Sequence, residues 1–270
     1  LVSNRPLGDY DVNLVVQYEY VPTTGKVDGI STGGRAEVWA TDALRLGVSG
    51  VRETTGIADS TLAGADLLLR HSDGTFLSFE AARSEGPGFG TSFSLNGGLE
   101  IDPANPSAGV SGAPAMGYRL KARADLADFG GKGFVAAYYD DREAGFSSPD
   151  LDITEAQTTW GIDGEVAVAP KLALTFGADR FHDATSRTRM DGRVGLAYDL
   201  TGQTRLEVEL AHTDRTTPAS TLEEDNGTRS VVGTRLTWAR DDDLSVWGFA
   251  QGTLRHDGGR LVLASFHPRL

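Results

Sequence analysis

Charged side chains recur at every second residue in several segments, and this spacing could give them a common role. Alternate residues of an extended strand share one face, so each segment would present a row of charge. Rows of acids facing rows of bases across a narrow, water-filled pore would set up a transverse field that selects among solutes. If the rows paired with one another, they would instead stiffen a closed structure. The rows comprise Arg119, Lys121, Arg123, Asp163, Glu165, Asp179, Arg189, Asp191, Arg193, Glu207 and Glu209.

The sequence offers little for catalysis or for metal binding. Its histidines are scattered and none has the spacing of metal ligands. His182 precedes Asp183, and His212 lies two residues before Asp214. Each could form the acid–base pair of a hydrolase. No Gly-x-Ser-x-Gly nucleophile motif accompanies them. We therefore expect no enzyme activity, no metal centre and no cofactor.

Acidic clusters outside the rows have two interpretations. They occur at Asp140 and Asp141, at Asp150 and Asp152, and at 223–225. Such carboxylates could bind divalent cations that bridge lipopolysaccharide. The simpler interpretation is that they are solvated acidic loops.

The segment 187–212 shows how the rows would be positioned. It reads as two strands joined by a short turn at 200–203, with a clear period of two. Val194, Leu196 and Val208 lie on one face, opposite the charged residues on the other. An apolar face opposite a charged face is what a strand of a transmembrane barrel needs, with lipid outside and water inside.

Composition narrows the class of protein. The chain has 270 residues, 39% of them hydrophobic, and no run of apolar residues long enough for a membrane-spanning helix. The net charge of -13 and the lack of a basic stripe argue against nucleic-acid binding. Without cysteine, the chain has neither disulfides nor thiolate metal sites. The start shows no signal-peptide pattern, so an exported protein would be a mature chain or a fragment.

The same alternation of apolar and polar residues recurs along the chain and predicts one domain. Residues 1–9 form an irregular lead-in, and residues 10–266 form an antiparallel up-and-down β-barrel of about fourteen strands. Tight turns alternate with longer polar loops, as in outer-membrane barrels. The segment 84–114 is expected to be one long loop, with a possible short strand at 91–99, and is long enough to fold inward as a plug. The predicted strands are 10–20, 35–41, 44–51, 62–70, 76–83, 116–126, 134–139, 155–166, 172–180, 187–199, 204–212, 231–239, 244–255 and 260–266.

A soluble β-sandwich pair or a β-propeller is the alternative fold. Either explains the alternation and the turns, but explains less well why the apolar face is nearly free of charge. Aromatic residues near strand ends, such as Trp160, Tyr198 and Trp238, fit the girdles of a membrane barrel. Aromatic residues also favour strands in general, so this observation does not decide between the two folds.

Four segments are similar to a known class of proteins: Glu80–Gly86, Ser94–Leu99, Tyr118–Leu126 and Asp141–Phe146. Together they resemble the C-terminal barrel-like regions of large Gram-negative surface proteins that carry repeated immunoglobulin-like modules upstream. The resemblance covers roughly residues 60–150. It implies an outer-membrane location and a possible anchoring role, and it transfers no catalytic residue. The sequence holds no such modules, and it continues past Phe266 instead of ending on an aromatic residue, so the final signal is shifted or the native chain is longer.

These observations lead to one expectation and one alternative. We expect a barrel in the bacterial outer membrane that forms a pore for small hydrophilic solutes. The alternative is a plugged barrel that acts as a membrane anchor or as a subunit of a surface or secretion complex. The expected partners are outer-membrane lipid, lipopolysaccharide and the barrel assembly machinery, with no nucleic acid.

Overall fold

A computed structural model describes residues 30–54, 59–86, 92–93, 102–103, 113–148, 151–221, 226–240 and 244–257. Within these residues the protein is all-β and is built on one antiparallel sheet of 12 strands. The strands of this sheet are β1 (Ile30–Trp39), β2 (Leu44–Thr54), β3 (Asp59–Arg70), β4 (Phe76–Glu85), β7 (Pro114–Asp125), β8 (Gly133–Arg142), β11 (Gln157–Ala169), β12 (Leu172–Asp183), β13 (Thr188–Asp199), β14 (Thr204–Thr216), β15 (Gly227–Ala239) and β16 (Ser245–Asp257).

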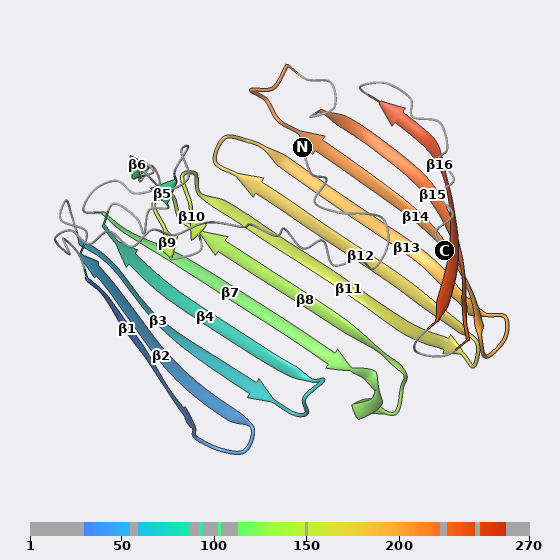
Figure 1. The fold of residues 1–270 in the computed structure, drawn as a ribbon, viewed down its shortest axis with the longest axis horizontal. Coiled ribbons are helices and arrows are strands. Elements are labelled where there is room, and N and C mark those ends of the chain that lie inside the picture. The colour runs from blue at the N-terminus through green and yellow to red at the C-terminus, as the bar shows by residue number, and fades with distance from the viewer. Residues whose placement is uncertain are drawn as a thin grey trace.

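Each strand of this sheet pairs with the next one along the chain. The order is β1-β2-β3-β4-β7-β8-β11-β12-β13-β14-β15-β16, and Figure 1 shows the strands side by side in this order, with the sheet curling at its β16 side. Two small hairpins complete the strands: β5 (Ser92–Phe93) with β6 (Asp102–Pro103), and β9 (Ser147–Ser148) with β10 (Leu151–Asp152). The predicted antiparallel up-and-down arrangement is therefore confirmed for the described part of the chain.

Short connections gather at one end of the sheet and have clear local causes. In the β1–β2 turn, the Thr41 hydroxyl accepts hydrogen bonds from the amides of Ala43 and Leu44, at 3.2 and 3.0 Å. Between β7 and β8 the chain forms a short 3-10 helix, η1 (Leu126–Phe129), which ends at Gly130 with a left-handed φ of 79°. Glycine adopts that conformation without strain, so it closes the helix.

Two predicted strands, 10–20 and 260–266, lie outside the described residues, as does most of 84–114. Inside the described part, Asp140 and Asp141 were wrongly placed in a loop, because β8 continues through them to Arg142. The pairing continues because Asp140 extends the charged side of the strand and meets Arg119 on β7. β14 likewise continues past its predicted end at residue 212, to Thr216. The predicted short strand at 91–99 is described only at Ser92–Phe93.

One face of the sheet is apolar and exposed. Directly paired residues lie on the same face of a sheet, and the register joins Leu172, Tyr198 and Leu206 in one row and Leu174, Leu196 and Val208 in the next. The exposed large hydrophobic residues of this apolar face include Val48, Leu69, Phe79, Leu120, Tyr139, Ile162, Val194, Leu196, Tyr198, Val208, Leu210, Leu236 and Trp238.

The buried core is correspondingly small. Within the described residues, the buried hydrophobic side chains are Ala115, Phe146, Ile153, Ala197 and Val231. No helix among these residues has the length and apolar character needed to cross a membrane. A sheet of this size with so little buried apolar area leaves most of its hydrophobic surface in contact with the surroundings.

Candidate functional site

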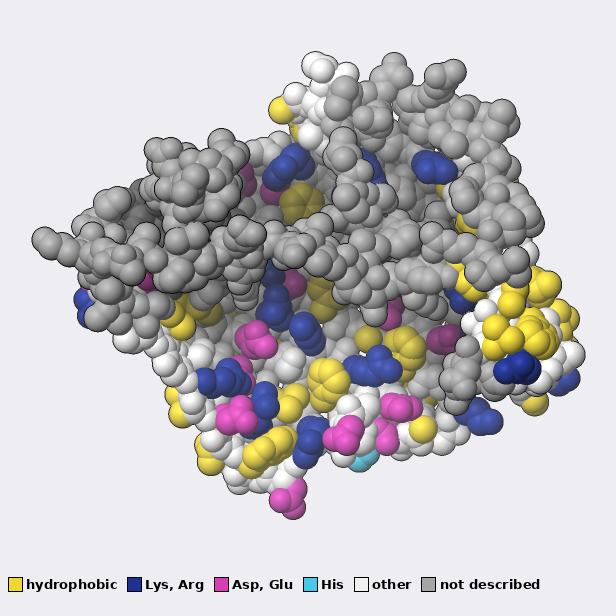
Figure 2. Space-filling view, viewed as in Figure 1, with side chains coloured by type: hydrophobic (Ala, Val, Ile, Leu, Met, Phe, Trp, Pro, Cys, Tyr) yellow, Lys and Arg dark blue, Asp and Glu magenta, His cyan; other side chains and the backbone are white. Residues whose placement is uncertain are grey.

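The sheet brings all the predicted charged rows to its other face, called here the charged face. The register pairs Arg119 directly with Asp140, Asp179 with Asp191, and Ala197 with Glu207, so each row continues on the same side of the next strand. Figure 2 shows basic and acidic side chains interleaved across the face that points toward the viewer. Arg119, Lys121, Arg123, Asp163, Glu165, Asp179, Arg189, Asp191, Arg193, Glu207 and Glu209 all lie on the charged face.

Arg119 is neutralised by acids on both neighbouring strands. Its Nε donates to Oδ1 of Asp140 on β8 at 2.8 Å, and its Nη1 lies 3.9 Å from Oε2 of Glu80 on β4. Arg142 also approaches Asp140, at 3.5 Å. Sequence analysis did not assign Glu80 or Asp140 to the rows, although Glu80 follows the same alternation.

A second ion pair spans more distant strands. The Nη2 of Arg205 on β14 donates to Oε1 of Glu165 on β11 at 2.8 Å, and so crosses both β12 and β13. The residues beneath the bridge are small: Ala173 on β12 is paired with Ala197 on β13, and Ala197 is 3% exposed. This contact requires the sheet to be concave on its charged face.

Asp179 and Asp191 are direct neighbours on β12 and β13, an unfavourable placement for two like charges. Each has its own donors: the Tyr138 hydroxyl donates to Asp179 at 2.8 Å, while Asp191 accepts from Arg189 at 2.5 Å and from Thr213 at 2.8 Å. These hydrogen bonds offset the repulsion between the two carboxylates.

Tyr138 reaches Asp179 because the strand between them carries a glycine. A Cβ at Gly161 on β11 would lie 2.5 Å from Cε1 of Tyr138 and 2.7 Å from Oδ1 of Asp179. Gly47 on β2 likewise leaves room for the carboxylate of Asp66 on β3. That carboxylate accepts a hydrogen bond of 2.8 Å from Arg35 on β1. Sequence analysis missed the Arg35–Asp66 pair as a site, because its members are far apart in sequence.

The remaining row residues have fewer partners. Among the described residues, Lys121, Asp163 and Arg193 take part in no ion pair within 4.0 Å. Arg123 lies over the ring of Phe134, 4.1 Å from its centroid. The charged face therefore mixes neutralised positions with charges that remain available to solutes.

The segment that follows β8 folds over the charged face. The ring of Phe146 lies over Gly117 on β7, where a Cβ would come within 2.8 Å of it. Phe146, Ile153 and Ala115 form a small buried cluster, and the buried amide of Ser147 donates to the Ser84 hydroxyl at 3.0 Å. The plug predicted in 84–114 lies mostly outside the described residues. The described residues that pack over the charged face include Phe146, Ser147 and Ile153.

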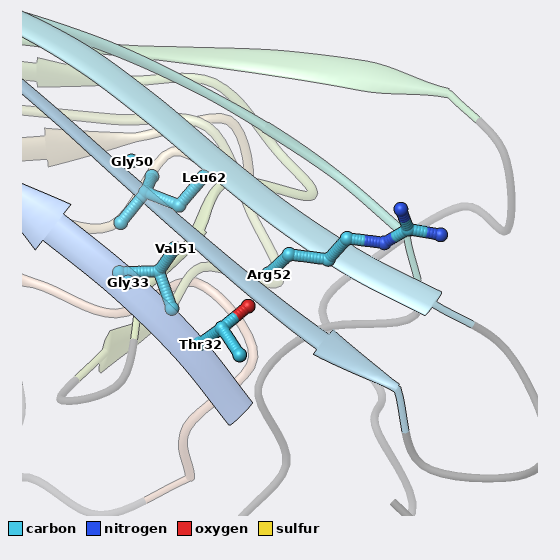
Figure 3. A pocket seen from close by; sticks show the side chains of 6 residues that line it. All are labelled: Thr32, Gly33, Gly50, Val51, Arg52 and Leu62. Atoms are coloured by element: carbon cyan, nitrogen blue, oxygen red, sulfur yellow. The ribbon is translucent and has the colours of Figure 1, made fainter. Parts of the chain in front are cut away.

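The remaining candidate features do not form a second site. A shallow pocket at β1–β3 is lined by Thr32, Gly33, Gly50, Val51, Arg52 and Leu62, but Figure 3 shows the Arg52 side chain extending away from it. No group of three or more potential metal ligands is present in the described part of the chain. His182 and His212 lie on the apolar side of the sheet, and His212 contacts the Ser230 hydroxyl at 2.9 Å.

Comparisons with known proteins give no family for this chain. No protein-family model matches it, and no curated protein matches it.

Proposed function

We propose that the chain forms a β-barrel in the bacterial outer membrane and conducts small hydrophilic solutes through its interior. The observation that carries this proposal is the division of the sheet into an exposed apolar face and a concave charged face. A soluble protein would cover an apolar surface of this extent, because leaving it in water is unfavourable. In a membrane barrel the apolar face would contact lipid, and the charged face would line a water-filled interior.

The extent of the apolar face fits this environment. On β13 it runs from Met190 to Tyr198, about 26 Å of extended strand. Charged residues on this face, such as Arg83, Arg180 and Asp214, lie toward the end of the sheet where the long connections after β4, β8 and β14 begin. In outer-membrane barrels those connections face the outside of the cell.

In this proposal the barrel has about fourteen strands, with the segments 10–20 and 260–266 completing the sheet of the described residues. The barrel assembly machinery would insert it, and outer-membrane lipid would surround it. We propose no enzymatic role.

Planar-bilayer recording of the refolded full-length chain tests the proposal. Steady, ion-selective openings are expected, because Lys121, Asp163 and Arg193 remain unpaired on the charged face within the described residues. Failure to insert into vesicles at all would contradict the membrane location. Insertion without conductance would contradict the pore alone.

The second candidate is a plugged barrel that serves as a membrane anchor or as a subunit of a surface or secretion complex. Two observations favour it: Phe146 and Ile153 pack over the charged face, and Arg205 bridges to Glu165 across that face. Both features narrow the space above the sheet. A barrel of this kind would insert normally and carry no current.

A further inference from the structure

A groove crosses the apolar face over β12 to β15. Its walls are the side chains of Leu174, Val194, Leu196, Val208, Leu210 and Val232. All six project from the apolar face, and Val194, Leu196, Val208 and Leu210 are 43–50% exposed. The groove is therefore an open depression with apolar walls, which suits an apolar ligand.

Small residues lie between the groove and the next charged residue of this face, Arg180. Ala178 on β12 and Gly192 on β13 are direct partners on the apolar face, and a Cβ placed at Gly192 would meet nothing within 4 Å. The next row on this face pairs Arg180 with Met190. Phe176 lies in the same row as Val194, and the distance along β12 from Phe176 to Arg180 is about 13 Å.

Arg180 differs from the other described arginines of the apolar face. Arg52 pairs with Asp59, and Arg83 with Glu85 at 3.3 Å. Arg180 is exposed, lies between Trp160 and Met190, and has no carboxylate within ion-pair distance among the described residues. An exposed guanidinium at the edge of an apolar surface can form a strong, bidentate contact with a phosphate or a carboxylate.

We infer that the groove and Arg180 form a binding site for one phosphorylated acyl lipid of the outer leaflet. The acyl chain lies in the groove, passes over Ala178 and Gly192, and brings the phosphate to Arg180, which can bind it in a bidentate manner. His212, paired with Gly192 on the same face, borders the path. Asp214 lies beyond Met190 in the row of Arg180, and Asp141 lies in the adjoining row with His182. The inference rests on the proposed membrane location.

Titration of the detergent-solubilised full-length chain with lipid A, the phosphorylated and acylated anchor of lipopolysaccharide, tests the site. Arg180→Gln should weaken lipid A binding about tenfold, the effect of losing one charge-assisted interaction. Arg83→Gln removes a charge from the same face and should leave the affinity unchanged. Equal losses in both variants, or no loss in Arg180→Gln, would overturn the inference.

A second variant separates the lipid from a free anion. Gly192→Leu fills the path without altering Arg180, so it should weaken lipid A binding while inorganic phosphate, a much weaker ligand, binds as before. If inorganic phosphate competed with lipid A at equal concentration, the groove would have no role and the inference would be wrong. Insertion into vesicles is measured in parallel. Failure of the wild-type chain to insert contradicts the proposed function. Normal insertion together with unchanged lipid A binding in Arg180→Gln contradicts only the lipid site.

Discussion

Arg205 on β14 bonds Glu165 on β11 with 2.8 Å between Nη2 and Oε1, although two strands separate them. Adjacent strands lie about 4.8 Å apart, so in a flat sheet the two backbones would be about 14 Å apart. Both side chains also have to lean over small neighbours, Ala173 and Ala197. The pair thus marks the curvature of the sheet toward its charged face.

A double-mutant cycle on Arg205→Gln and Glu165→Gln measures how much this bridge contributes. Both side chains are about one-third exposed, at 35% and 38%, so solvent screens the interaction. We expect a coupling energy below about 1 kcal/mol in urea unfolding from vesicles. A coupling energy of zero would mean that the bridge adds nothing to the stability of the folded sheet.

Gly161→Ala should destabilise the sheet by about 1–3 kcal/mol, because the added methyl group collides with Tyr138 and Asp179. Gly192→Ala is the matched control, since its methyl group would enter open space. Unfolding in urea compares the two. Equal stabilities would contradict the close approach of Tyr138 to Asp179.

Val208→Arg places a charge in the middle of the apolar face and should cost about 2–4 kcal/mol in lipid. Gln251→Arg introduces the same side chain on the charged face, opposite Gly233, and should cost much less. Folding into vesicles, followed by the shift of folded protein on gels, reports both. The proposed orientation of the faces is wrong if the two variants behave alike.

Arg193→Glu should shift the selectivity of an open pore toward cations. Arg193 leans over Gly177 on the charged face and forms no ion pair in the described part of the chain, so its reversal changes the local field directly. Reversal potentials in a salt gradient measure the shift. Arg52→Glu, on the opposite face, is the control that should leave the potential unchanged.

Acid should weaken the end of the sheet that carries the tight turns. The hydroxyls of Ser72 and Thr75 donate to Asp128 in η1 and hold the pKa of its carboxyl below the ordinary value. Because the folded-state pKa is lower than the unfolded one, the stabilisation is complete above about pH 4 and is lost as the pH falls further. Asp128→Asn should therefore lose less stability than the wild type between neutral pH and about pH 3 in urea unfolding. An equal loss in both proteins would show that Asp128 is not responsible.

The strands and their faces could be predicted from the sequence because both follow from a period of two. Leu206 and Val208 alternate with Arg205 and Glu207, and the structure places them on opposite faces as expected. The end of β8 was missed because its last residues are charged. Hydrogen-bonded pairing continues wherever a partner strand is present, so a strand can extend beyond its apolar residues.

Contacts across several strands could not be predicted. The Glu165–Arg205 and Asp66–Arg35 pairs depend on the curvature of the sheet and on the glycine or alanine between the partners, which no local pattern encodes. The packing of Phe146 on the charged face depends on its fit over Gly117. A loop without periodicity gives no sign of the surface on which it will pack.

The order of the strands also bears on how such a chain could assemble. In the described part of the chain, each strand of the large sheet forms backbone hydrogen bonds with its neighbours in strand order, and the longest connection lies between Glu85 and Pro114. Closing a loop of that length adds little entropic penalty over a short one. The sheet can therefore form by adding one hairpin at a time to its edge. A chain interrupted partway would form a regular, narrower sheet whose last strand has unpaired backbone N–H and C=O groups.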